Sequence, residues 1–168
     1  VETHACALGD VYTFGPTFRA ENSHTSRHLS EFWMIEPEIS FADLSDDMAL
    51  AEDYVKYCAR YALENCAADL AFFEEEYPAG EKGLRARLHN VIDNDFGQIT
   101  YTAAVALLQK EIAEGRGEFE NYPSWGIDLG SEHERYLTER IYKKPLIVIN
   151  YPKDIKAFYM KLNDDNQT

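Results

Sequence analysis

Near its start the chain has two stretches in which apolar and polar residues alternate, the pattern of half-buried strands. The first runs from Val11 to Arg19 and is rich in aromatic and β-branched residues, with a bend expected near Gly15-Pro16. The second runs from Glu31 to Phe41. The polar segment from Glu21 to Ser30 separates them and indicates a loop. We therefore predict an antiparallel pair of strands.

The alternation assigns different chemistry to the two faces of this pair. Arg19 and Glu21 are two residues apart, so they project to one side, and Phe32 and Glu36 share a face of the second strand. Antiparallel pairing is expected to bring these groups together. The aromatic residues of the other parity are expected to lie in the core. These are Tyr12, Phe14, Trp33 and Phe41.

The middle third of the chain has the spacing of helices. One long helix is predicted from Met48 to Tyr77, ended by Pro78-Ala79-Gly80. Further helices are predicted over residues 82–92 and, capped by Thr102, over residues 103–114.

The last third begins with Ser131 and Glu134, which have the spacing of a capping box and predict a helix to Tyr142. Short strands are then predicted over residues 146–150 and 155–162. Strands at both ends of the chain around a helical middle indicate the α+β class rather than alternating βαβ units.

Composition limits the possible functions. The chain has 168 residues, 45% of them hydrophobic, as in one folded domain, and 30 acidic against 16 basic residues give a net charge of −14. This acidity argues against tight nonspecific nucleic-acid binding by this chain. Three cysteines without metal-type spacing and the lack of a long apolar run indicate an intracellular protein with inert thiols and no membrane span. The chain begins without Met, and we expect it to be part of a longer protein.

The densest group of reactive side chains lies at the predicted hairpin loop. Arg19 offers bidentate contacts to phosphate, Phe32 a stacking surface, and Arg27 and His28 further cations. These are the components of a nucleotide site, although ordinary surface ion pairs would also explain such a strand. Walker, dinucleotide and HExxH motifs are absent from the sequence.

This cluster resembles motif 2 of the class II aminoacyl-tRNA synthetases, through FRAE at 18–21 and RHLSEF at 27–32. The longer segment YTFGPTFRAENSHTSRHLSEFWMIEPE at 12–38 is similar to the asparaginyl branch of that family, as are WGIDLGSEHERYLTE at 125–139 and YPKDIKAFYMKLNDD at 151–165. Three long motifs in the same order make a chance match improbable.

The resemblance implies part of a catalytic domain on an antiparallel sheet, with motif 2 at 12–38, a helical insertion at about 45–120, and a later core helix and strands at 125–165. It implies a cytoplasmic or organellar homodimer that activates asparagine with ATP and Mg²⁺ and transfers it to tRNA(Asn). Motifs 1 and 3, the metal ligands and the main tRNA-binding module are expected outside these 168 residues, so the chain alone is expected not to charge tRNA.

The resemblance also assigns roles to individual residues. Arg19 would hold the α-phosphate and the amino-acid carboxylate, and Glu21 would lie on the nucleotide side as the second catalytic residue. Arg27 and His28 would grip the β- and γ-phosphates, Phe32 would stack on adenine, and Glu36 would read the amino or amide group of the substrate. The nucleotide-binding set implied in this way is Arg19, Ala20, Glu21, Arg27, His28, Leu29 and Phe32.

Two kinds of alternative stay open at this point. Within the enzymes, an aspartyl-tRNA synthetase or a synthetase-like asparagine synthetase would share most of these motifs. Outside them, a truncated, catalytically inactive interaction protein would retain motif 2 without its chemistry.

Overall fold

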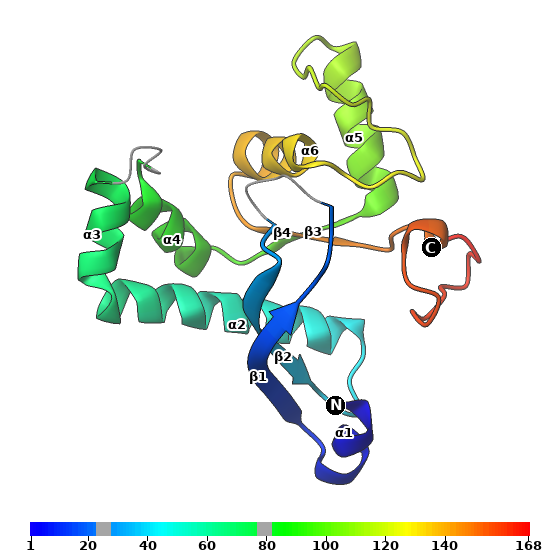
Figure 1. Ribbon diagram of the computed structural model, residues 1–168. Coiled ribbons are helices and arrows are strands. Elements are labelled where there is room, and N and C mark those ends of the chain that lie inside the picture. The colour runs from blue at the N-terminus through cyan, green and yellow to red at the C-terminus, as the bar shows by residue number, and fades with distance from the viewer. Residues whose placement is uncertain (23–27, 77–81) are drawn as a thin grey trace. The chain divides into compact units, whose positions relative to one another are not determined.

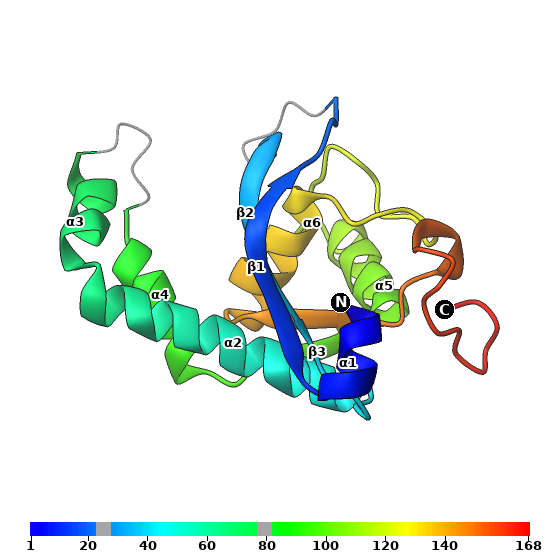
Figure 2. The same cartoon turned by 60° about the horizontal axis from the view of Figure 1, so that its bottom comes forward.

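The predicted antiparallel hairpin forms the centre of the first of two units, Val1–Leu50, in the computed structural model (Figures 1 and 2). The structure describes residues 1–22, 28–76 and 82–168. Strands β1 (Val11–Phe18) and β2 (Glu31–Glu38) pair antiparallel along their whole length. A short helix, α1 (Glu2–Leu8), precedes β1 and contacts it, and the Ser40 hydroxyl donates to carbonyl groups of that helix and of Gly9.

The register of the hairpin confirms the predicted faces. Thr13 lies opposite Glu36 and Thr17 opposite Phe32, so odd positions of β1 and even positions of β2 share one face. The ladder continues beyond Phe18, because the Arg19 N–H donates to the Ser30 carbonyl at 2.8 Å. Arg19 therefore continues the odd-numbered face on which Phe32 and Glu36 lie.

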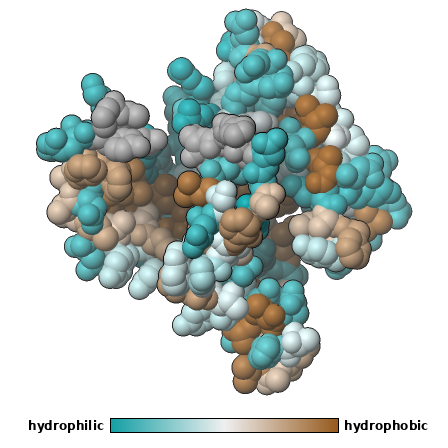
Figure 3. Space-filling view, viewed as in Figure 1, coloured by the Kyte–Doolittle hydropathy of each residue, from teal (hydrophilic) through white to brown (hydrophobic). Residues whose placement is uncertain are grey.

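The opposite face of the hairpin is exposed, and the prediction that its aromatic residues lie in the core is wrong. Tyr12, Phe14 and Trp33 are 65–70% exposed, and Phe41 is fully exposed. A two-stranded sheet buries a face only where another layer packs on it. In the described part of the chain these aromatic side chains stay largely exposed. Figure 3 shows apolar side chains among hydrophilic ones on the side of the molecule in view.

The predicted long helix is two helices. Helix α2 (Leu44–Asn65) begins in the first unit and continues into the second, Ala51–Thr168, where α3 (Ala67–Glu75) follows. The backbone leaves the helical region at Cys66, with φ −118° and ψ 37°. Helix α4 (Leu84–Asp93) packs against α3, and Arg85 donates to the Ala67 carbonyl just beyond the break. The predicted end at Tyr77 and Pro78-Ala79-Gly80 lies outside the described residues.

A parallel pair of short strands supports the second unit. Strand β3 (Gly97–Thr100) pairs with β4 (Leu146–Ile149). Along the chain, three helices connect these strands: α5 (Tyr101–Ala113), α6 (Ser131–Arg135) and the π-helix η1 (Tyr136–Tyr142). Strand β3 was not expected. The strand predicted over residues 155–162 is wrong, because a 3₁₀ turn (Lys153–Ile155) and local turn hydrogen bonds such as Met160 N–H to Ala157 carbonyl take its place. The antiparallel β1–β2 sheet, with most helices following it along the chain, confirms the α+β class.

The core of the second unit lies between α5, α6 and the strands. Its buried apolar members are Tyr101, Ala104, Val105, Leu108, Leu129 and Leu137. Two predicted caps differ from the structure. At the start of α5 the hydroxyl of Thr100, not of Thr102, accepts from the Ala103 N–H. Helix α6 begins after Gly130, whose N–H donates to Nδ1 of the buried His133, so the predicted capping box of Ser131 and Glu134 is wrong.

Side chains of α5 and α6 form hydrogen bonds with the backbone of the irregular segment 118–130, called the 118–130 loop below. The Tyr101 hydroxyl, on a fully buried side chain, donates to the Ile127 carbonyl at 2.6 Å and accepts from the Gly126 N–H at 3.0 Å. The Glu132 carboxylate accepts from the backbone N–H groups of Glu120 and Asn121 at 2.7 and 2.9 Å. These N–H donors lower the pKa of Glu132.

Candidate nucleotide-binding site

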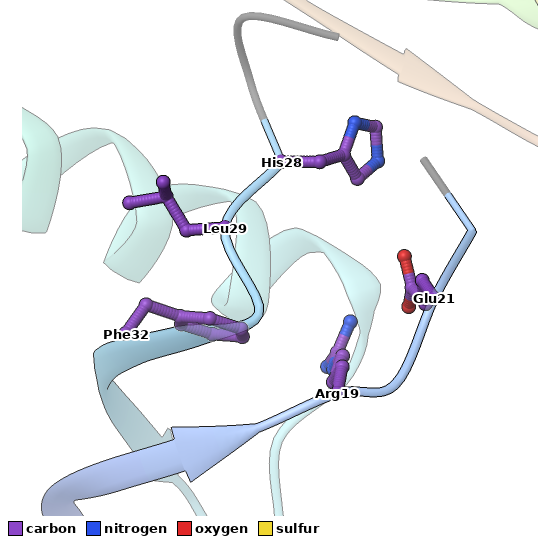
Figure 4. A pocket seen from close by; sticks show the side chains of 5 residues that line it. All are labelled: Arg19, Glu21, His28, Leu29 and Phe32. Carbon is purple, nitrogen blue, oxygen red and sulfur yellow. The ribbon is translucent and has the colours of Figure 1, made fainter. Parts of the chain in front are cut away.

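A pocket of about 380 Å³ opens at the loop end of the hairpin, within the first unit (Figure 4). Figure 4 shows Arg19 and Glu21 approaching it from the β1 side and His28, Leu29 and Phe32 from the β2 side. The pocket is lined by Arg19, Glu21, His28, Leu29 and Phe32. All five belong to the set expected from the sequence.

The strand ladder fixes the geometry of the two central side chains. The Arg19 backbone is held by its hydrogen bond to Ser30, and its guanidinium carbon lies 5.6 Å from the centre of the Phe32 ring, a cation–π contact. Phe32 is half-buried, so part of its side chain remains accessible to a ligand. A cation and a flat aromatic surface are thereby offered next to each other.

The pocket combines groups of opposite charge with an apolar wall. Arg19 provides five N–H donors in a planar fork that matches phosphate or carboxylate oxygens. Glu21 can accept hydrogen bonds from an amine or hydroxyl, and His28 can donate to an oxygen. A ligand with a flat ring and a neighbouring anionic group satisfies this arrangement.

The remaining predicted site residues lie in three different situations. Ala20 lies between Arg19 and Glu21 but does not line the pocket. Arg27 lies outside the described residues. Glu36 lies on the same strand face as Phe32 but beyond the pocket, four residues further along β2.

One contact on this face was missed by the sequence reasoning. The Thr13 hydroxyl donates to Oε2 of Glu36 at 3.1 Å across the hairpin. Threonine is a common strand residue, so its type gives no signal. The sequence did indicate that Thr13 lies on the strand face of Arg19, because the two residues are an even number of positions apart.

The described residues do not provide a metal site. Among residues 1–22, 28–76 and 82–168, His, Cys, Asp and Glu form no group of three or more that could hold a metal ion. In the same ranges, none of the helices has the length and apolar character that crossing a bilayer requires.

Comparison with known proteins identifies the class. The sequence profile of the family described as tRNA synthetases class II (D, K and N) matches residues 2–168. The chain belongs to this family.

The similar curated proteins narrow the relationship to one branch. The chain is 62% identical to asparagine–tRNA ligase, cytoplasmic 1, of Arabidopsis thaliana over 168 residues, which are 29% of that protein. It is 58% identical to the asparagine–tRNA ligase of Alkaliphilus oremlandii, of which it covers 35%. The chain thus spans about a third of the length of these relatives.

Solved structures agree with this relationship. Asparaginyl-tRNA synthetase from Pyrococcus horikoshii, complexed with asparaginyl-adenylate, superposes with a TM-score of 0.78 at 35% identity over 98% of this chain and 34% of that one. An aspartyl-tRNA synthetase from Entamoeba histolytica has a TM-score of 0.73 at 24% identity over 97% of this chain and 31% of its own, which shows a shared fold.

Proposed function

We propose that the enzyme containing this chain activates asparagine with ATP and ligates it to tRNA(Asn). The observation that supports this most directly is Arg19 beside Phe32 in a pocket that also contains Glu21 and His28. The high identity to relatives named asparagine–tRNA ligase supports asparagine as the amino acid.

The first reaction joins two anions, and Arg19 suits it. A carboxylate oxygen of asparagine attacks the α-phosphorus of ATP, the bond to the bridging oxygen of the β-phosphate breaks, and pyrophosphate leaves with the bonding pair. A guanidinium that contacts both the carboxylate and the α-phosphate cancels their repulsion and aligns them. Charge grows on the phosphoryl oxygens during the exchange, so a fixed cation stabilises the transition state more than the ground state.

The rest of the pocket positions the nucleotide. The Phe32 ring offers a stacking surface for adenine. Glu21 would lie on the nucleotide side, and His28, together with Arg27, would contact the β- and γ-phosphates. In the second reaction a terminal hydroxyl of the tRNA attacks the acyl carbon and AMP leaves. ATP reactions of this kind use Mg²⁺, which neutralises phosphate charge, and we place its ligands outside this chain.

The partners follow from the same proposal. With a net charge of −14, this chain suits contact with the enzyme's own other parts better than broad contact with tRNA, so we propose that tRNA(Asn) binds mainly elsewhere. We further propose a homodimer, on the family resemblance, and a cytoplasmic location, which the name of the 62% identical relative supports. The segment at about 45–120 would be an insertion in the catalytic domain.

Pyrophosphate exchange into ATP tests the proposal. The complete enzyme should support exchange with asparagine and not with aspartate, and exchange with aspartate alone would assign it to the aspartyl branch. Arg19→Ala should lower kcat/KM about a thousandfold, as expected when about 4 kcal/mol of transition-state contact is lost. Glu75→Ala, at an exposed helix position, should change kcat/KM little. Equal effects of the two changes would mean that the site is misplaced.

A further inference from the structure

The face of the hairpin that lines the pocket continues beyond it to a second polar pair. Along β2 this face runs from Phe32 through Met34 to Glu36, and along β1 from Thr17 through Gly15 to Thr13. Glu36 lies four residues after Phe32 along the strand, a distance of about 13 Å. In the proposed function the adenine stacked on Phe32 and the asparagine group held by Glu36 are therefore separate parts of the bound substrates.

The hairpin leaves room between these two positions. Gly15 lies midway and has no side chain, and a Cβ placed on it would have no heavy atom within 4 Å. The face above Gly15 is thus open next to Thr13. On β2 the half-buried Met34 lies opposite Gly15, between Phe32 and Glu36.

The contact between Thr13 and Glu36 has a defined direction. An ionised carboxylate only accepts hydrogen bonds, so the Thr13 hydroxyl is the donor, at 3.1 Å to Oε2. The hydroxyl has one hydrogen and engages one oxygen, so this bond leaves the lone pairs of Oε1 for another donor. It also restrains the rotation of a glutamate side chain that is exposed to solvent.

We infer that Thr13 is a positioning residue for asparagine binding, which it serves by holding Glu36 in the orientation that accepts N–H groups of the substrate. This inference rests on the proposed function, in which Glu36 reads the amino or amide group of asparagine. Asparagine carries such donors in both its α-ammonium and its side-chain amide. Pre-orienting the acceptor reduces the entropy lost on binding, so the effect belongs to the affinity for the amino acid.

The test uses the complete enzyme and measures KM for asparagine and for ATP by pyrophosphate exchange. Thr13→Val keeps the shape and removes the hydroxyl, and it should raise KM for asparagine about threefold to tenfold with KM for ATP within about twofold. Thr13→Ser retains the donor and should restore KM for asparagine to within about twofold of the unaltered enzyme. Thr13→Ala provides a second variant without the hydroxyl and should match Thr13→Val.

A matched control separates this effect from a general change in the strand. Thr17→Val makes the same replacement on the same strand and face, opposite Phe32, and should leave KM for asparagine unchanged. If Thr13→Val and Thr13→Ser behaved alike, or if KM for ATP rose with that for asparagine, the role of Thr13 would be structural and the inference would be overturned.

Glu36→Gln distinguishes failure of the inference from failure of the proposed function. A large rise in KM for asparagine in Glu36→Gln without one in Thr13→Val would overturn only the role of Thr13. An unchanged KM in Glu36→Gln would show that Glu36 does not read asparagine, and the inference would fall while ligation of asparagine still stood. Absence of asparagine-dependent exchange in the unaltered enzyme would overturn both.

Discussion

Removing the hydroxyl of Tyr101 should destabilise the second unit without touching the candidate site. Tyr101 is fully buried and is the first residue of α5, and its hydroxyl joins that helix to the 118–130 loop. It donates to the Ile127 carbonyl at 2.6 Å, with the Ser124 carbonyl at a longer 3.3 Å, and it accepts from the Gly126 N–H at 3.0 Å. Tyr101→Phe keeps the ring and its packing, so the change removes these hydrogen bonds alone.

The magnitude follows from what the change leaves behind. Each of the two shorter hydrogen bonds, to Ile127 and Gly126, contributes about 0.5–1.5 kcal/mol, and a carbonyl or N–H left without a partner away from water costs about 1–3 kcal/mol. Because the freed groups of Ile127 and Gly126 can regain part of their hydration, we expect a loss of about 2–3 kcal/mol in the free energy of unfolding. This is a large fraction of the roughly 5–15 kcal/mol by which domains are stable.

Urea unfolding followed by circular dichroism measures this loss, and hydrogen exchange locates it. The urea concentration at the unfolding midpoint should fall, while the dependence of the free energy of unfolding on urea concentration stays the same. Protection of backbone amides from exchange should decrease first in residues 124–127. Tyr122→Phe is the matched control, because Tyr122 lies in the same loop and is 59% exposed. A loss below about 0.5 kcal/mol for Tyr101→Phe, or equal losses for the two variants, would refute the assigned role of the hydroxyl.

Two further predictions concern the pocket and the loop. Phe32→Ala should raise KM for ATP about tenfold, because stacking of a base on an aromatic ring contributes about 1–3 kcal/mol, whereas Phe32→Tyr keeps the ring and should not. Pyrophosphate exchange measures KM for ATP in both variants. The same KM for ATP in Phe32→Ala and Phe32→Tyr would exclude stacking. The second concerns Glu132, whose pKa lies below its ordinary value of 4.5 because the N–H groups of Asn121 and Glu120 donate to it. Its ionised form therefore stabilises the folded chain above that value, and the contribution disappears as pH falls through the lowered pKa. The gap in thermal midpoint between the unaltered protein and Glu132→Gln should narrow from about pH 5 to pH 3, and a constant gap would contradict the mechanism.

The hairpin and its face were predictable because strand periodicity is a local property. Once Arg19 and Phe32 are placed on strands of period two, antiparallel pairing brings them together, and the structure has them 5.6 Å apart. The exposure of Phe14 and Trp33 was not predictable in this way. Alternation shows which residues share a face, but burial depends on whether another layer covers that face.

The differences in the second unit arise from contacts distant in sequence. Nothing in the Ala-rich sequence around Cys66 marks a break, and the structure places Arg85 of a later helix against it. Strand β3 has four residues, too few for alternation to be recognised, and its partner β4 follows more than forty residues later. His133 replaces Glu134 in the contact at the start of α6 because its ring reaches both Gly130 and the Asn121 carbonyl.

The two faces of the hairpin also constrain how the gene can change. A residue inserted between the strands lengthens the connection, and the pairing from Val11 opposite Glu38 to Phe18 opposite Glu31 can persist. A residue inserted within either strand shifts every later side chain to the other face. An insertion in β1 would turn Arg19 away from Phe32, so changes of length within this strand should abolish activity.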